Sequence, residues 1–323
     1  MRHLWSRMRL NRFVVLGRVG MDLYADPPGI RIEDATRFTT ALGGSAGNIA
    51  VALARQGAQV VMVSAVSNDA VGRYCLAQLH GYGVDCSHIC AVAGEARNSL
   101  AVTETRAEGC QVVLYRNGAA DFALSVDQTC GVDYTNVSAL IITGTALATE
   151  PSRAATFSAI AAARKGAALV VLDIDYRAYS WASVAEAATV CAQAAMLSDI
   201  VIGNEDEFGL LAGDIAKGQH YARQHAANAI FSVYKQGSAG SITYTPDFHF
   251  RTGIYTVVAQ KPMGAGDGFM GGLMAGLAQG QTLDAAVRRG AATAAMIVAG
   301  VGCAPASPTP TEIEQFMDRT TCT

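Results

Sequence analysis

Short apolar runs rich in β-branched residues alternate with Ala-rich segments along most of this chain. The runs lack the polar residue at every second position that marks a half-exposed strand, and the Ala-rich segments are long enough for helices. Continuous apolar strands that alternate with helices are typical of a mainly parallel sheet covered on both faces, so the pattern predicts an α/β fold. We expect strands at 13–19, 60–66, 139–143, 169–174, 200–203 and 230–234, and helices at 46–55, 70–81, 153–165 and 183–195.

Two regions interrupt this alternation. The segment 22–40 is polar and too short for a strand–helix–strand unit. Residues 99–105 and 111–116 form a predicted hairpin with its turn around 107–109. We expect these regions to form a small sheet outside the main one. The segments that contribute to it should be about 20–41 and 98–118.

The last third of the chain has a different pattern. We expect a hairpin within 241–258, a strand at 255–259 and three helices from residue 264 onward. No segment is long enough to serve as a linker between domains. Residues 1–323 are therefore expected to form a single domain.

Composition excludes several classes of protein. Hydrophobic residues make up 51% of the chain and charged residues 16%, which suits a large buried core. The net charge of −3 argues against a nucleic-acid partner, because general nucleic-acid binders are usually basic. The longest uncharged stretch, 290–311, is broken by Gly300, Gly302 and Pro305. We expect it to be a buried helix followed by a loop, and not a membrane span.

The N-terminus and the cysteines bear on the compartment. The Arg-rich segment 1–12 is followed by an apolar run, 13–16, that is too short for a signal peptide, so we expect a frayed start. The eight cysteines include no CxxC pair and no zinc-ligand spacing. Small buried thiols in a reducing environment explain them best, which favours a cytoplasmic protein.

The most informative segment is the turn Gly264-Ala265-Gly266-Asp267, which opens an apolar helix extending to Gly280. The first turn of a helix binds anions through its free N–H groups and the helix dipole, and glycines let these groups converge. An ionised Asp there can accept a proton from a substrate hydroxyl while the amides hold a phosphoryl group. The alternative is an ordinary Gly-rich turn with Asp as N-cap. The segment is neither a Walker A loop nor a GxGxxG dinucleotide fingerprint.

A second glycine cluster, 42–48, opens the helix that ends near residue 57. Close backbone approach at Gly44 and the side-chain amide of Asn48 suit a polyhydroxylated ligand, whereas the alternative is a helix start capped by Ser45. Asp22 follows the first strand, at the edge where ligands bind in such folds, but it could also be an ordinary turn residue. These three residues are consistent with a sugar site.

In this order along the chain, these segments resemble the ribokinase-like (PfkB) family of carbohydrate kinases. Residues 43–48 match its N-terminal signature and 263–269 match its C-terminal signature. Asn204 and Glu207 match its NxxE motif, and 235–240 is similar to its nucleotide-binding turn. The similarity covers nearly the whole chain.

The resemblance implies a ribokinase-like three-layer α/β/α sandwich, in which the small β-sheet forms a lid over the sugar and often also a homodimer interface. It implies transfer of a phosphoryl group from ATP, with Mg²⁺, to a sugar hydroxyl, with Asp267 as the base. The other implied site residues are Gly264, Ala265 and Gly266 for the anion hole, Asp22, Gly44 and Asn48 for the substrate, Lys235, Gly237, Gly240 and Asn204 for ATP, and Glu207 with Asn204 for Mg²⁺ through water.

Three arginines favour an acidic sugar as the substrate. Arg18, Arg116 and Arg177 lie at or just beyond predicted strand ends, and a planar guanidinium pairs bidentately with a carboxylate. Taken alone, each of them is better explained as a structural or phosphate-binding Arg. The run DYRxYxW at 175–181 resembles family members that act on a keto-deoxy sugar acid. Alternatives are a 2-dehydro-3-deoxygluconate kinase, a fructokinase, or a non-catalytic sugar- or nucleotide-binding regulator, which the intact Asp267 disfavours.

One departure from the family concerns Lys261. Many members have an Asp at this position, six residues before the base and near a monovalent-cation site. A Lys supplies its own positive charge and disfavours a bound K⁺. We therefore predict weak or absent activation by K⁺.

Overall fold

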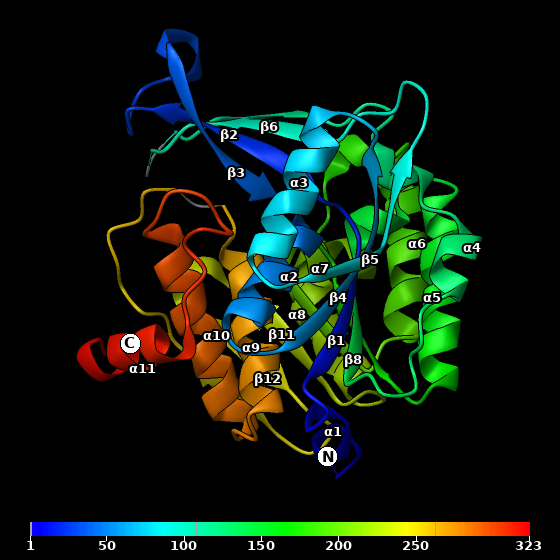
Figure 1. The fold of residues 1–323 in the computed structure, drawn as a ribbon. Helices are drawn as coiled ribbons and strands as arrows, with labels where there is room; N and C mark the ends of the chain where they lie inside the picture. The colour runs from blue at the N-terminus through cyan, green and yellow to red at the C-terminus, as the bar shows by residue number, and fades with distance from the viewer. Residues whose placement is uncertain (1, 107–108, 262) are drawn as a thin grey trace.

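The computed structural model describes residues 2–106, 109–261 and 263–323. Within these residues the main sheet comprises β1 (Arg12–Leu16), β4 (Gln59–Ser67), β5 (Asp85–Val92), β8 (Ala139–Thr143), β9 (Leu169–Asp173), β10 (Ile200–Asn204), β11 (Phe231–Lys235), β12 (Ser241–Tyr244) and β13 (His249–Thr252). Their order is β13-β12-β11-β10-β9-β8-β1-β4-β5 (Figure 1). All pairs from β11 to β5 are parallel, and β12 and β13 add an antiparallel hairpin at one edge. The predicted, mainly parallel sheet is confirmed.

Helices cover both faces of this sheet. One layer contains α1 (Arg2–Met8), α2 (Ser45–Arg55), α3 (Ala70–Gly81), α9 (Ala265–Ala278) and α10 (Leu283–Val298), and the other contains α4 (Val126–Cys130), α5 (Ser152–Lys165), α6 (Val184–Met196), α7 (Glu205–Ala212) and α8 (Gly218–Ala226). Alternate residues of β1 divide between two cores: Phe13 and Val15 pack with the first layer, Val14 and Leu16 with the second. The three-layer α/β/α arrangement is therefore a consequence of strands that are apolar on both faces.

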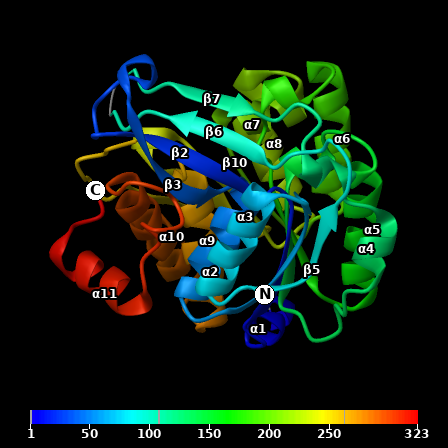
Figure 2. The ribbon, with the colours of Figure 1, turned by 45° about the horizontal axis from the view of Figure 1, so that its top comes forward.

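A second sheet comprises β2 (Gly20–Asp26), β3 (Arg37–Gly43), β6 (Ser99–Thr103) and β7 (Val112–Tyr115), in the order β3-β2-β6-β7. These strands come from the two segments expected to form the small sheet. The tip of the predicted hairpin, residues 107–108, lies outside the described residues. Because β2 begins just after β1 ends, the small sheet lies across the carboxyl ends of the parallel strands (Figure 2). This edge is where ligands bind in open α/β folds.

The expectation of a frayed N-terminus is wrong for the described residues. Residues 2–8 form α1, and the side chains of Leu4 and Met8 are completely buried against the first helical layer. Arg7 fixes the helix further, since its Nη2 donates to the carbonyl oxygen of Val137 at 2.6 Å. Apolar residues four apart on one helical face were the signal in the sequence.

The expected strand at 255–259 is also wrong. The sheet ends at β13, and Tyr255 makes only an isolated bridge to Cys322 near the C-terminus. The Tyr255 ring packs on Phe316 of α11 (Pro310–Arg319), with ring centroids 5.5 Å apart. The β-branched residues of this segment fit a strand locally, but its tertiary partners are a helix and the chain end, so no ladder forms.

The uncharged stretch 290–311 is a buried helix followed by a loop, as expected. Helix α10 ends at Val298, and irregular structure continues to the start of α11. None of the described helices is long and apolar enough to cross a membrane.

Candidate active site

The first turn of α9 presents Asp267 at the carboxyl edge of the main sheet. Gly264, the N-cap, has φ +84°, and a Cβ there would overlap the Sγ of Cys303. Glycine is therefore required both by the backbone conformation and by the close packing. The N–H of Gly268 makes the first helical bond, to the carbonyl of Gly264 at 3.0 Å, so the amides of Ala265, Gly266 and Asp267 have no carbonyl within the helix to bond. This turn can bind an anion.

Asp267 is held by a residue from a distant part of the chain. Asn48 Nδ2 donates to Asp267 Oδ2 at 2.8 Å. Burial and then repulsion from Asp175 raise the pKa of Asp267 to about 6, against the opposing effects of the Asn48 hydrogen bond and of Arg177 and Arg18. A carboxyl with that pKa is ionised at neutral pH and still basic enough to take a proton.

Asn48 is positioned by the Gly-rich start of α2. Gly44, its N-cap, has φ +90°, and a Cβ there would overlap the carbonyl group of Arg18. The same carbonyl accepts a hydrogen bond from the N–H of Gly47 at 3.2 Å, which fixes the helix start against the end of β1. Sequence analysis placed Gly44 and Asn48 in a sugar site, and the structure places Asn48 beside Asp267.

Asp22 lies on β2 in the small sheet, and Arg18 lowers the pKa of both Asp22 and Asp267. Asp22 is next to Gly43, where no side chain would fit, and its Oδ2 accepts from the hydroxyl of Tyr24 at 3.0 Å. Burial raises its pKa, while Arg18, Tyr24 and Lys261 act in the opposite direction. A carboxylate in that position can accept hydrogen bonds from ligand hydroxyls.

A cluster of charged residues follows β9. Arg177 Nη2 is 2.8 Å from Asp175, and its Nη1 is 3.9 Å from Glu207. Burial alone would raise the pKa of Asp175, but Arg177 and the hydrogen bond from the Thr145 hydroxyl at 3.0 Å hold it below its usual range. The side chain of Arg177 is 45% exposed, so its free face can still bind an anion.

Lys235 ends β11 directly opposite the anion-binding turn. Its Nζ would lie 3.3 Å from a Cβ on Gly266, and it is 3.9 Å from Asp173 Oδ1. Burial raises the pKa of Asp173 to about 8. Lys235 opposes this shift, and the carboxylates of Glu207 and Asp175 add to it. Sequence analysis missed Asp173, although an Asp at the end of a buried strand was a usable signal.

Asn204 and Glu207 form a capping box at the start of α7. The Asn204 side chain accepts from the N–H of Glu207 at 2.9 Å, and Glu207 Oε2 accepts from the N–H of Asn204 at 2.7 Å. The buried Glu207 carboxylate is thus held in place, with Oε1 facing Arg177. No group of three or more metal-ligating side chains is close enough to hold an ion among the described residues.

Gly237 and Gly240 form the turn between β11 and β12. Their φ angles are +55° and +81°, and a Cβ on Gly240 would overlap the carbonyl of Thr252. The N–H of Gln236 closes the turn on the carbonyl of Gly240 at 2.8 Å. Both glycines therefore lie beside Lys235, where sequence analysis expected a nucleotide.

The three predicted arginines have different environments. Arg116 is buried, with Nη2 paired to Asp121 at 2.5 Å and bonded to the carbonyl of Thr145 at 3.1 Å. Arg18 donates through Nη1 to Ser99 at 3.2 Å, and its buried Nε has no partner within the described residues. Arg18 and Arg177 retain donors for a ligand, whereas Arg116 mainly connects the segment after β7 to the loop after β8.

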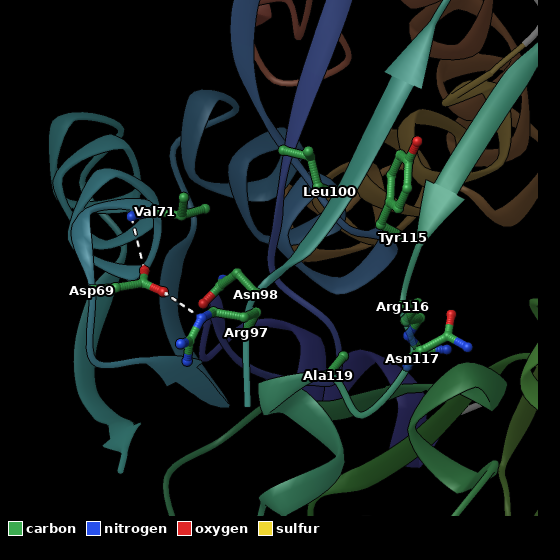
Figure 3. Close-up of a pocket in the computed structure, with 9 residues that line it drawn as sticks. All are labelled: Asp69, Val71, Arg97, Asn98, Leu100, Tyr115, Arg116, Asn117 and Ala119. Atoms are coloured by element: carbon green, nitrogen blue, oxygen red, sulfur yellow. Dashed lines mark hydrogen bonds and ion pairs between the residues drawn. The ribbon is translucent and has the colours of Figure 1, made fainter. Parts of the chain in front are cut away.

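A cavity of about 550 Å³ lies at the base of the small sheet (Figure 3). It is lined by Asp69, Val71, Arg97, Asn98, Leu100, Tyr115, Arg116, Asn117 and Ala119. Arg97 is paired with Asp69 across it, and Asp267 is not part of its wall. Arg116 lines the cavity and donates to the carbonyl of Thr145, whose hydroxyl donates to Asp175, so the cavity adjoins the charged cluster after β9.

Comparison with known proteins agrees with this geometry. Residues 10–310 match the family described as pfkB family carbohydrate kinase, and the chain belongs to that family. It is a phosphotransferase with an alcohol group as acceptor. It is 38% identical over 311 residues to a 5-dehydro-2-deoxygluconokinase of Photobacterium profundum, with 94% of each chain covered. It is 36% identical over 317 residues to 5-dehydro-2-deoxygluconokinase 2 of Bacillus cereus, again with 94% of each covered.

A solved structure shares the fold. A double mutant of Vibrio cholerae fructokinase, in its fructose-, ADP- and potassium-bound form, superposes with a TM-score of 0.82 at 25% identity, covering 95% of this chain and 98% of that one. The ribokinase-like fold predicted from the sequence is confirmed.

Proposed function

We propose that this protein uses ATP to phosphorylate 5-dehydro-2-deoxy-D-gluconate to its 6-phosphate in the cytoplasmic catabolism of myo-inositol. The observation that carries the proposal is the position of Asp267, on the anion-binding turn of α9, bonded to Asn48 and opposite Lys235. A base, an anion hole and a fixed cation are the parts that phosphoryl transfer requires. The two relatives named for this sugar acid support the choice of substrate.

In the proposed mechanism, Asp267 takes the proton of the sugar hydroxyl as its oxygen bonds to the γ-phosphorus of ATP. The bond from that phosphorus to the β–γ bridging oxygen breaks, and ADP leaves. The amides of Gly264, Ala265 and Gly266 and the ammonium of Lys235 offset the charge on the transferring group. Gly237 and Gly240 border the nucleotide.

Mg²⁺ bound with ATP would neutralise charge on the phosphates in this proposal. Glu207 and Asn204 would hold its water ligands, because Mg²⁺ keeps several waters when it binds at phosphates. The raised pKa of Asp173 fits a nearby cation: the carboxylates of Glu207 and Asp175 repel its charge, and Lys235, Arg177 and Arg18 balance these carboxylates in part. A divalent ion would favour the ionised form of Asp173.

The substrate would lie between the small sheet and α2. Asp22, the backbone at Gly44 and the Asn48 amide would hold its hydroxyls. Its carboxylate would bind Arg18 or Arg177, which have free N–H donors. Arg116 would contribute less directly, because among the described residues only its Nε lacks a hydrogen-bond partner. A fructokinase or a 2-dehydro-3-deoxygluconate kinase would use the same base with another sugar.

We also propose a single domain, 1–323, in which segments of about 20–41 and 98–118 form a lid that pairs with the lid of a second copy. Strand register places nine apolar residues on the outer face of the small sheet, opposite to the face of Asp22: Met21, Leu23, Ala25, Phe38, Leu42, Leu100, Val102, Val113 and Tyr115. Tyr115 is 60% exposed and Val113 42%. Such a contiguous apolar face on a monomer favours a homodimer.

A coupled ADP-release assay with Mg-ATP tests the function. The panel comprises 5-dehydro-2-deoxygluconate, 2-dehydro-3-deoxygluconate, fructose, ribose and adenosine. We expect turnover with the first sugar acid at a kcat/KM well above the others. Turnover confined to another sugar would overturn the substrate and keep the Asp267 mechanism, and binding without turnover would support the regulator.

A further inference from the structure

Lys261 is a completely buried lysine whose charge is not paired. Its relative exposure is 0%, and none of the residues described forms an ion pair with its ammonium, although the carboxylate of Asp22 attracts it from a longer distance. Nζ instead donates to the carbonyl of Met263 at 3.0 Å, to the carbonyl of Ile297 at 3.2 Å and to Cys303 Sγ at 3.6 Å. A buried charge is costly unless it is compensated, so this arrangement of neutral acceptors is unusual for a lysine.

The two carbonyls come from the ends of adjoining helices. Met263 directly precedes Gly264, the N-cap of α9. Ile297 is in the last turn of α10, at the negative end of the helix dipole, and its carbonyl also accepts from the N–H of Gly300 at 3.2 Å. The backbone of Gln260 reinforces the junction by donating to the carbonyl of Val298 at 2.8 Å. Converging carbonyl oxygens of this kind are what a dehydrated alkali cation binds.

We propose that the ammonium of Lys261 is a built-in replacement for a monovalent cation and positions the anion-binding turn. A trans peptide fixes its C=O and the following N–H in opposite directions. By holding the Met263 carbonyl, Lys261 therefore aims the N–H of Gly264 away from itself and sets the start of α9. In this proposal the chain carries its cation as a side chain.

Removing the side chain tests this positioning role, which rests on the proposed function for its activity readout. Lys261→Ala leaves the carbonyls in place and opens room for a small cation, and Lys261→Met fills that room without charge. We expect Lys261→Ala to lose about 10-fold or more in kcat in tetramethylammonium buffer, since a charge-assisted hydrogen bond is lost. K⁺, ammonium or methylammonium should restore it saturably, but should not restore Lys261→Met. Lys217→Ala, an exposed control, should behave as wild type.

A second readout is independent of the substrate. The melting temperature of Lys261→Ala should rise with added K⁺ or ammonium, while those of wild type and Lys261→Met should not change beyond the general salt effect shared by all variants. If no sugar is turned over, the proposed function fails, and the melting curves still decide the role of Lys261.

Three results would overturn the proposal: strong K⁺ activation of the wild-type enzyme, a Lys261→Ala enzyme as active as wild type without added cation, or a Lys261→Ala protein whose activity and melting temperature ignore all three cations. A variant that stays unfolded in K⁺ and ammonium counts as the third result.

Discussion

Asn48 and Asp267 are 219 residues apart in the chain, and a 2.8 Å hydrogen bond joins them. Each lies in the first turn of a helix whose N-cap is a glycine with positive φ, Gly44 at +90° and Gly264 at +84°. The two Gly-rich segments therefore bring their helix starts together at one point, and the bond lowers the pKa of the base.

Replacing Asn48 with Ala should shift the pH dependence of the reaction. The amide favours the ionised form of Asp267, so its loss raises the pKa of that carboxyl above about 6. The acid limb of kcat/KM should then move to higher pH, and the loss of activity should be larger at pH 6 than at pH 8. Asn228→Ala, on the surface, is the control. An equal loss at both pH values would exclude this coupling.

Lys235→Met should reduce kcat more than it weakens ATP binding. The ammonium is next to Gly266 and would stabilise charge that develops on the transferring phosphoryl group. We expect a loss of about 10²- to 10³-fold in kcat from steady-state kinetics, comparable to removal of an anion-hole donor. Lys217→Met, at an exposed site, controls for the loss of a charge. A variant with unchanged kcat and raised KM for ATP would make Lys235 a ground-state binder.

Replacing Arg18 and replacing Arg116 should affect different properties, substrate binding and stability respectively. Arg116→Ala leaves Asp121 buried without its partner, which should lower the free energy of unfolding by about 3–5 kcal/mol in a urea titration. Arg18→Ala should leave stability nearly unchanged and raise KM for the sugar acid about 10-fold or more, because a charge-assisted hydrogen bond is lost. An Arg116→Ala enzyme of normal stability with a raised KM would reverse the two roles.

The small sheet should determine the oligomeric state. Val113→Asp places a charge on the outer face of the small sheet, on its edge strand β7, and light scattering after gel filtration should then report a monomer. Val184→Asp, at a residue that is 63% exposed on α6, should remain a dimer. A wild-type protein that is monomeric at high concentration would contradict the interface.

The sequence contained enough to predict the parallel sheet, because strands such as 139–143 and 169–174 are apolar on both faces. The turn at Gly264 could also be predicted from the sequence, because its backbone conformation requires glycines. The failure at 255–259 had a different cause. That segment has strand-like residues, but its partners, Phe316 and the chain end, are distant in sequence. A segment becomes a strand only when it pairs with another strand, and this pairing cannot be predicted from the local sequence.

The sequence also does not show which residues pair with the charged groups. Nothing near Arg116 in the sequence shows that its guanidinium stacks over Phe122 and pairs with Asp121 rather than facing a ligand. Asp173 was overlooked because Asp175 and Arg177 formed the more distinctive motif. Burial raises the pKa of Asp173; Glu207 from α7 adds to the shift and Lys235 from β11 opposes it, and neither residue is near Asp173 in the sequence.

The most direct test of Asp267 as the base compares the pH–rate profiles of the wild-type enzyme and the Asp267→Asn variant. In the wild-type enzyme kcat should rise with pH through about 6, as Asp267 ionises, and stay level above it. Asp267→Asn should lose about 10²- to 10⁴-fold in kcat and lose that acid limb, with ADP affinity by calorimetry little changed. An Asp267→Asn enzyme that keeps a rate near wild type with the same limb would show that another group is the base.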